Sequence, residues 1–254
     1  MEEVCRSEYL MPSDAIGIIL AIIAEISLPV KSFLVDFRSR GTGRVDKKRL
    51  RVPLYRQPTF RTAWAHLQEL CLEYSMTLGT FDWAKDLILH TTGLRKLSLD
   101  FEFNHSYSFL GSLLSSAHIL QGLQDFRLGC AHITVDMLSS FLLYARDSLR
   151  AVSFRDVYVF RGTWVAILRE LRSKFPPLER ISVDWLKEYR SRGKINIEFP
   201  TLSENPVVPN SQGRKSTLRY NEWKGVERVL GPSYHGRAGM DAALEILAKS
   251  AEHT

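Results

Sequence analysis

The stretch Leu94-Arg-Lys-Leu-Ser-Leu-Asp-Phe101 indicates the fold, because its apolar residues stand at Leu94, Leu97 and Leu99. The same spacing, with apolar residues three and five positions after the first, recurs at four further starts: Leu67, Leu123, Leu149 and Leu178. Successive starts are 27, 29, 26 and 29 residues apart, and a sixth instance begins at Val30, 37 residues before Leu67. A nearly fixed period of this length is typical of a solenoid, in which each unit buries its apolar side against its neighbours.

Each unit reads as a strand, a loop and a helix. After the strand that begins at Leu94, the apolar residues change to helical spacing at Phe109, Leu110, Leu113 and Leu114. Strands joined by helical crossovers become parallel neighbours in one sheet. The sequence therefore predicts an α/β solenoid of six irregular units, with parallel strands on its concave side and helices on its convex side.

The segments that flank the repeats have different patterns. Ser13 or Asp14 can cap a helix that runs to about Glu25 and is apolar nearly all round, so a neighbouring element must cover it. We expect this capping helix in residues 1–29, the solenoid in 30–186 with a basic insertion at 38–56, and a loop-rich tail in 187–254. A terminal helix is predicted within the tail, from Met240 to Lys249.

Charge is unevenly distributed along the chain, which has a formal net charge of +6. Residues 38–56 carry eight basic side chains and one acidic one, whereas residues 57–186 carry thirteen of each. The insertion could bind a nucleic acid or another anionic surface. Its candidate polyanion-binding residues are Arg44, Lys47, Lys48, Arg49 and Arg51. The alternative is a flexible, solvated loop, since Tyr55 and Phe60 alone make no stacking platform for bases.

Cysteine usage and hydropathy indicate the compartment. The three cysteines are scattered and form no CxxC pair, which favours a reduced intracellular setting, cytoplasmic or nuclear. The longest apolar stretch, from Ala15 to Ile26, is shorter than the roughly 20 residues that a membrane span needs. We therefore expect no membrane association.

No motif in the sequence indicates catalysis. There is no GxSxG, no GxGxxG, no paired-carboxylate motif and no histidine spacing suited to a metal. Cys130 and His132 form an isolated pair that is typical of structure rather than of a zinc site. The sequence therefore predicts a chain that is not an enzyme and that needs neither a metal nor a cofactor.

The residues between and just after the repeated apolar positions should face the concave surface, in three columns across the strands. The first column contains Glu69, Lys96 and Asp125; the second contains Ser98, Arg127 and Ser153; the third contains Asp36, Glu73, Asp100, Gly129 and Arg155. Cross-strand pairing explains the alternating signs of the first column, whereas the like charges of the third are disfavoured unless a cation or water compensates them. The candidate partner-binding residues are Asp36, Glu73, Lys96, Asp100, Arg127 and Arg155.

The repeat units resemble leucine-rich repeats without the usual asparagine, and the chain is similar to a broad family of fungal F-box proteins with degenerate repeats of this kind. The resemblance rests on Leu94–Phe101, on Gly162-Thr163-Trp164 and on the tail from Tyr234 to Ala248. It implies an intracellular protein-interaction module that recognises substrates for a ubiquitin ligase. An F-box has no room before Val30, so we do not expect this chain by itself to bind a Skp-type adaptor; the expected partner is a protein on the concave face.

Overall fold

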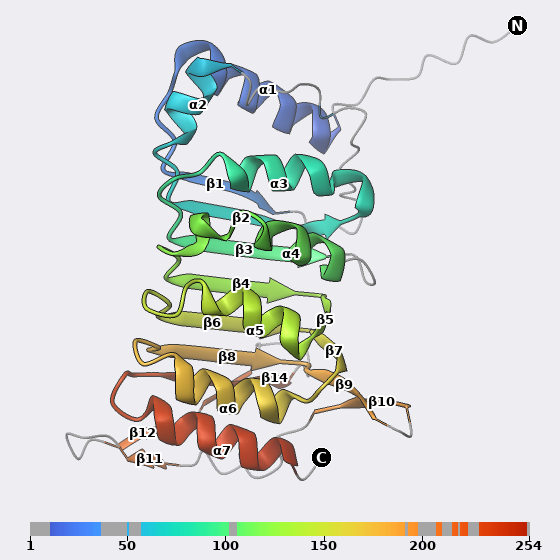
Figure 1. Cartoon of the computed structure of the whole chain (residues 1–254), viewed down its shortest axis with the longest axis vertical. Helices are drawn as coiled ribbons and strands as arrows, with labels where there is room; N and C mark the ends of the chain where they lie inside the picture. The colour runs from blue at the N-terminus through green and yellow to red at the C-terminus, as the bar shows by residue number, and fades with distance from the viewer. Residues whose placement is uncertain are drawn as a thin grey trace, which may run out of the picture.

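The structure is a computed structural model, and it describes residues 11–36, 50, 57–101, 106–190, 193–197, 207–209, 215–217, 219–222 and 229–252. It is a mixed α/β protein built on an eight-stranded sheet in the order β1-β2-β3-β4-β6-β8-β14-β13 (Figure 1). The strands are β1 (Ser32–Asp36), β2 (Glu69–Met76), β3 (Lys96–Phe101), β4 (Asp125–Gly129), β6 (Ala151–Arg155), β8 (Arg180–Asp184), β14 (Val229–His235) and β13 (Arg219–Glu222). From β1 to β8 all neighbours are parallel, which confirms the predicted pairing.

The repeated apolar residues lie at equivalent positions across this sheet. Leu97 pairs in register with Leu70 on one side and with Phe126 on the other, and all three side chains are buried. The same row continues through Val152 and Ile181. Each strand therefore turns the same apolar face toward the helices, as the spacing of the repeat predicted.

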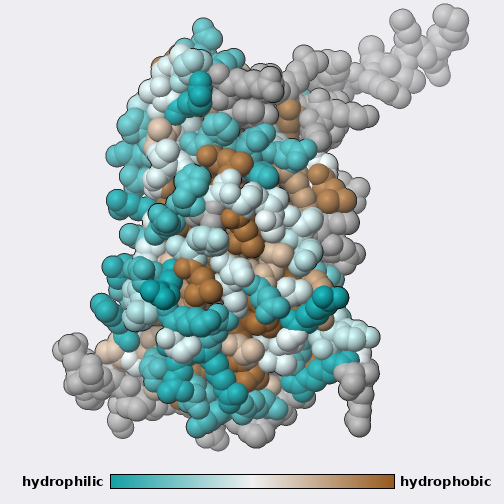
Figure 2. Space-filling model, in the orientation of Figure 1, coloured by the Kyte–Doolittle hydropathy of each residue, from teal (hydrophilic) through white to brown (hydrophobic). Residues whose placement is uncertain are grey.

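The helices form a row along one face of the sheet (Figure 1). They are α1 (Pro12–Ile26), α2 (Pro58–Trp64), α3 (Phe81–Leu89), α4 (Ser106–Leu114), α5 (Val135–Leu143), α6 (Trp164–Lys174) and α7 (Met240–Glu252), with short 3-10 turns η2 (Leu78–Thr80) and η3 (Ala117–Leu120). Two tryptophans anchor this layer, because the indole N–H of Trp64 donates to the carbonyl of Leu87 and that of Trp164 to the carbonyl of Lys187. Figure 2 shows the helix-bearing face, which is mostly hydrophilic with separate hydrophobic patches.

The first helix is only partly covered. Ile16, Leu20 and Ile23 are buried, whereas Ile18 and Ile22 are about half exposed. Its N-cap is Met11 rather than the expected Ser13 or Asp14, and Asp14 instead accepts a hydrogen bond from the Met11 backbone N–H at 3.0 Å.

A second, smaller sheet was not predicted. It has the order β10-β9-β7-β5 and consists of β5 (His132–Thr134), β7 (Tyr158–Arg161), β9 (Lys187–Arg190) and β10 (Gly193–Asn196). Cys130, Asp156 and Trp185 each follow a strand of the main sheet with φ near +50°, the left-handed conformation. These corners turn the chain from the main sheet into the second sheet before the helix or hairpin that follows.

The segment 187–254, which was expected to be loop-rich, contributes strands to three sheets. The expected terminal helix is α7, and its Asp241 and Glu245 form ion pairs with Arg172 of α6. Strand β14 adds to the main sheet antiparallel to β8, and β11 (Val207–Pro209) pairs with β12 (Lys215–Thr217). In the segment 38–56 the structure describes only Leu50, which is buried.

Candidate functional site

The face of the main sheet opposite the helices, here called the outer face, carries the three predicted columns. Ser98 pairs in register with Cys71 and Arg127, and Arg127 pairs with Ser153. In the third column the pairing runs from Asp100 through Gly129 to Arg155. The alternation of strand side chains thus places polar residues from neighbouring strands next to one another on this face.

A pocket of about 90 Å³ lies on the outer face across β2, β3, β4 and β6. It is lined by Glu73, Ser98, Leu99, Asp100, Arg127, Leu128, Gly129, Ser153 and Arg155. Because each lining side chain stands on a paired strand, the sheet fixes their relative positions. We call this hollow the outer-face pocket.

Two short hydrogen bonds organise the carboxylates of the outer-face pocket. The Ser98 hydroxyl donates to Glu73 Oε1 at 2.6 Å, and Arg155 Nη2 donates to Asp100 Oδ2 at 2.8 Å. Ser98, Glu73 and Asp100 are only 3%, 6% and 7% exposed, although they lie on the face without helices. Charge-assisted hydrogen bonds of this kind offset part of the cost of burying the two carboxylates.

Gly129 leaves the space that the Asp100–Arg155 pair occupies. A Cβ atom at position 129 would lie 2.6 Å from Asp100 Oδ1 and 3.4 Å from an Arg155 guanidinium nitrogen. No side chain fits there unless Asp100 moves. The other residues of the third column are charged, so the glycine at position 129 is the sequence signal for the Asp100–Arg155 pair.

Cys130 lies directly after β4 and contacts the same carboxylate. Burial raises the pKa of its thiol to about 12, and the charge of Asp100 and a hydrogen bond to it act in the same direction. The thiol is therefore protonated near neutral pH and is a poor nucleophile, since the thiolate is the reactive form.

Four of the six predicted partner-binding residues meet in the outer-face pocket: Glu73, Asp100, Arg127 and Arg155. Lys96 instead lies in the first column, where its ammonium is 3.7 Å from Glu69, and Asp36 lies on the edge strand β1 in register with Glu73. Ser98 and Ser153 complete the pocket, and the signal for them is their place in the second column. The predicted polyanion-binding residues Arg44, Lys47, Lys48, Arg49 and Arg51 lie outside the described residues.

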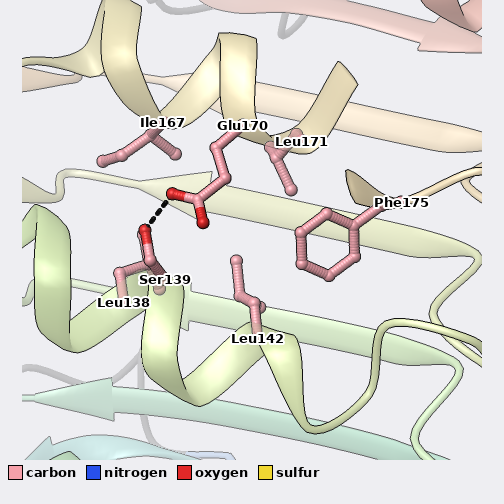
Figure 3. Close-up of a pocket in the computed structure, with 7 residues that line it drawn as sticks. All are labelled: Leu138, Ser139, Leu142, Ile167, Glu170, Leu171 and Phe175. Carbon is pink, nitrogen blue, oxygen red and sulfur yellow. Dashed lines mark hydrogen bonds between the residues drawn. The ribbon is translucent and has the colours of Figure 1, made fainter. Parts of the chain in front are cut away.

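A second hollow lies between α5 and α6 on the helix-bearing face (Figure 3). Its walls are apolar side chains such as Leu138, Ile167 and Phe175, and its one polar pair is the Ser139 hydroxyl donating to the Glu170 carboxylate. Glu170 also forms an ion pair with Lys174 at 2.7 Å. The Ser139 hydroxyl and the Glu170 carboxylate hydrogen-bond to each other between α5 and α6. This hollow is therefore part of the packing between the two helices.

Among the described residues, no group of three or more histidine, cysteine, aspartate or glutamate side chains is arranged to hold a metal ion. The described helices also include none with the length and apolar character needed to cross a bilayer.

No protein-family model matches this chain, and a search of curated protein sequences found no significant match.

Proposed function

We propose that this chain is an irregular leucine-rich-repeat-like solenoid that acts as an intracellular protein-interaction module, with the outer face as its concave binding surface. The observation that carries the proposal is the outer-face pocket, in which four neighbouring strands present fixed polar side chains. A solenoid of this kind uses its extended concave surface for binding.

The charges of the outer-face pocket favour selective recognition of a protein segment. Acidic side chains come from β2 and β3 (Glu73 and Asp100), whereas basic side chains come from β4 and β6 (Arg127 and Arg155). Arg155 already pairs with Asp100, and Arg127 pairs with Asp125 at 3.4 Å. A segment that crosses the strands would therefore place a basic residue near Glu73 and an acidic residue near the half-exposed Arg127. Complementary charges of this kind contribute mainly to specificity and to the rate of association.

Preorganisation supports the same proposal. Glu73 and Asp100 are already held by Ser98 and Arg155, so a partner would not have to order them on binding. Fewer immobilised side chains mean a smaller entropic cost of association. The proposal assigns no catalytic step and no cofactor to the pocket.

The resemblance to fungal F-box proteins suggests that the bound protein is a substrate for ubiquitination. The proposal is limited to substrate recognition, and direct binding of a Skp-type adaptor is not part of it. A pull-down with purified adaptor tests this limit, since stoichiometric co-elution of the chain would contradict it.

Charge reversal in the outer-face pocket tests the binding function. We expect Arg127→Glu to remove a defined set of proteins from quantitative affinity purifications and to weaken the purified partner at least tenfold, because it inverts the basic half of the pocket. Arg127 is about half exposed and pairs with Asp125 at 3.4 Å, so its replacement should lower the melting temperature only slightly. Arg146→Glu is the matched control, since Arg146 is comparably exposed and pairs, among the described residues, with its neighbour Asp147. If both variants retain the same proteins, the outer-face pocket is not the binding site.

A further inference from the structure

The second sheet presents aromatic rings and lysines on its outward side. Its inward side chains, Ile133, Val159 and Glu188, are fully buried. Because strand residues alternate between faces, their neighbours point outward. We call this surface the second-sheet face, and its residues are His132, Tyr158, Phe160, Lys187, Tyr189 and Lys194.

The rings on the second-sheet face lie close to one another and to a cation. His132 and Tyr158 meet edge to face with ring centroids 4.8 Å apart, and Lys194 Nζ lies 5.1 Å from the centroid of Tyr158. Tyr189 pairs in register with Lys194 across β9 and β10 and is 58% exposed. Phe160 contacts the exposed Tyr107 of α4 at 5.9 Å between centroids.

The second-sheet face carries Lys187 and Lys194 and has no acidic side chain among its own residues. The buried Glu188 carboxylate accepts from the backbone N–H of Trp164 at 3.0 Å and from Arg190, on the inward side. Asp156 forms an ion pair with Lys187. Lys194 is exposed and lies beside the exposed Tyr189, with which it pairs in register.

His132 is a neutral ring near neutral pH. Burial lowers the pKa of its imidazole below the ordinary value, and the positive charge of Lys194 lowers it further, with Asp156 acting in the opposite direction. The ring can therefore pack against other aromatic groups without the cost of desolvating an imidazolium.

We propose that the second-sheet face binds single-stranded nucleic acid, with one base stacked on Tyr189, a second near His132 and Tyr158, and the backbone phosphate at Lys194. Aromatic rings on an open sheet, next to a lysine, are the arrangement that stacks unpaired bases and neutralises phosphates. An acidic peptide would satisfy the lysine but would leave the exposed face of Tyr189 without a matching group. Double-stranded nucleic acid hides its base faces, so a single strand fits the rings best.

The rigidity of the second sheet supports this assignment. Tyr189 follows Glu188, whose carboxylate is held at the start of α6, and Lys187 is held by Asp156. The rings therefore project from a backbone that is fixed on both sides. Sites on rigid strands hold their geometry better than sites on loops.

Fluorescence anisotropy of a labelled ten-nucleotide oligouridylate, with the full chain as titrant, tests the proposal. We expect Tyr189→Ala to weaken binding about tenfold, because the loss of one base–aromatic stack is of this size. Tyr189→Trp should retain binding. Lys194→Ala should reduce the slope of log affinity against log salt by about 0.7, as the loss of one phosphate contact to a single strand does.

Matched controls separate stacking from general charge effects. Tyr144→Ala, at a comparably exposed tyrosine at the end of α5, should leave affinity unchanged. An abasic oligonucleotide should bind wild type and Tyr189→Ala alike, because it has no base to stack.

Three results would overturn the proposal. The first is no binding at low salt by a chain that melts normally. The second is equal affinity of Tyr189→Ala and Tyr144→Ala for oligouridylate. The third is equal sensitivity of oligouridylate and a polyglutamate peptide to Tyr189→Ala, which would assign the second-sheet face to acidic proteins instead.

Discussion

At the scale of single residues, a buried and hydrogen-bonded charge contributes more to stability than a surface ion pair does. Glu188 is fully buried, yet its carboxylate accepts from the first backbone N–H of α6 and from Arg190. Arg150 and Glu179 form an ion pair of 2.8 Å with both side chains more than one third exposed. Water screens the Arg150–Glu179 ion pair. The hydrogen bonds to Glu188 instead replace the hydration that its carboxylate loses on burial.

We expect Glu188→Ala to lower the free energy of unfolding by about 3 kcal/mol, because it leaves the helix N–H and Arg190 without their acceptor. Glu188→Gln should cost less, since the amide oxygen can still accept from Trp164. Glu179→Ala, the control, should cost no more than about 1 kcal/mol. Urea titration of the three variants provides the measurement, and equal midpoints for Glu188→Ala and Glu179→Ala would contradict the capping role.

At the scale of elements, each strand of the main sheet has one face against the helices and one outer face. Leu97 and Leu34 stand in neighbouring register rows, so they point to opposite sides of the sheet. Leu97 is fully buried, whereas Leu34 is 63% exposed at the edge strand β1. Ser98, next to Leu97, also points to the outer face but is nearly buried in the outer-face pocket. Direction and exposure are therefore separate properties of a strand residue.

We expect Leu97→Ala to destabilise the protein by about 2–5 kcal/mol, as truncation of a buried leucine leaves a cavity. Leu34→Ala makes the same chemical change on the other side of the sheet and should cost less than about 0.5 kcal/mol. Thermal unfolding followed by circular dichroism compares the two variants. Similar melting temperatures would show that the assignment of the two faces is wrong.

At the scale of the whole molecule, the strands and helices follow one another along the long axis, with α1 near one end and α7 near the other (Figure 1). One cluster of buried apolar side chains nevertheless extends from Ile16 to Ala251. Most strands of the main sheet touch only the strands beside them. A local loss of packing should therefore spread mainly to its neighbours.

We expect Leu247→Ala in α7 to accelerate amide hydrogen exchange in α6, β8 and β14 by at least tenfold. Helix α7 packs against α6 and β14, and β14 pairs with β8. Exchange in β2 and β3 should change less than twofold. Native-state exchange read by mass spectrometry resolves these segments. A uniform acceleration along the described residues would instead show one fully cooperative unit.

The spacing of apolar residues determined the parallel strands, their order from β1 to β8 and their register. This information is local, since each unit repeats the same pattern and one apolar face must meet the next. The columns of the outer face followed from the same alternation, which is why Glu73, Asp100, Arg127 and Arg155 could be named before the fold was known.

Only the tertiary structure decided the second sheet, the antiparallel addition of β14 and the burial of Ser98 and Glu188. The second sheet depends on bonds between distant residues, such as the Tyr158 N–H donating to the Ala131 carbonyl at 2.7 Å. Its strands are too short to show a period. Of the left-handed corners at Cys130, Asp156 and Trp185, only the aspartate is of a residue type enriched in this conformation. Backbone pairing between residues distant in sequence stabilises these features. The order of side chains along the sequence does not predict such pairing.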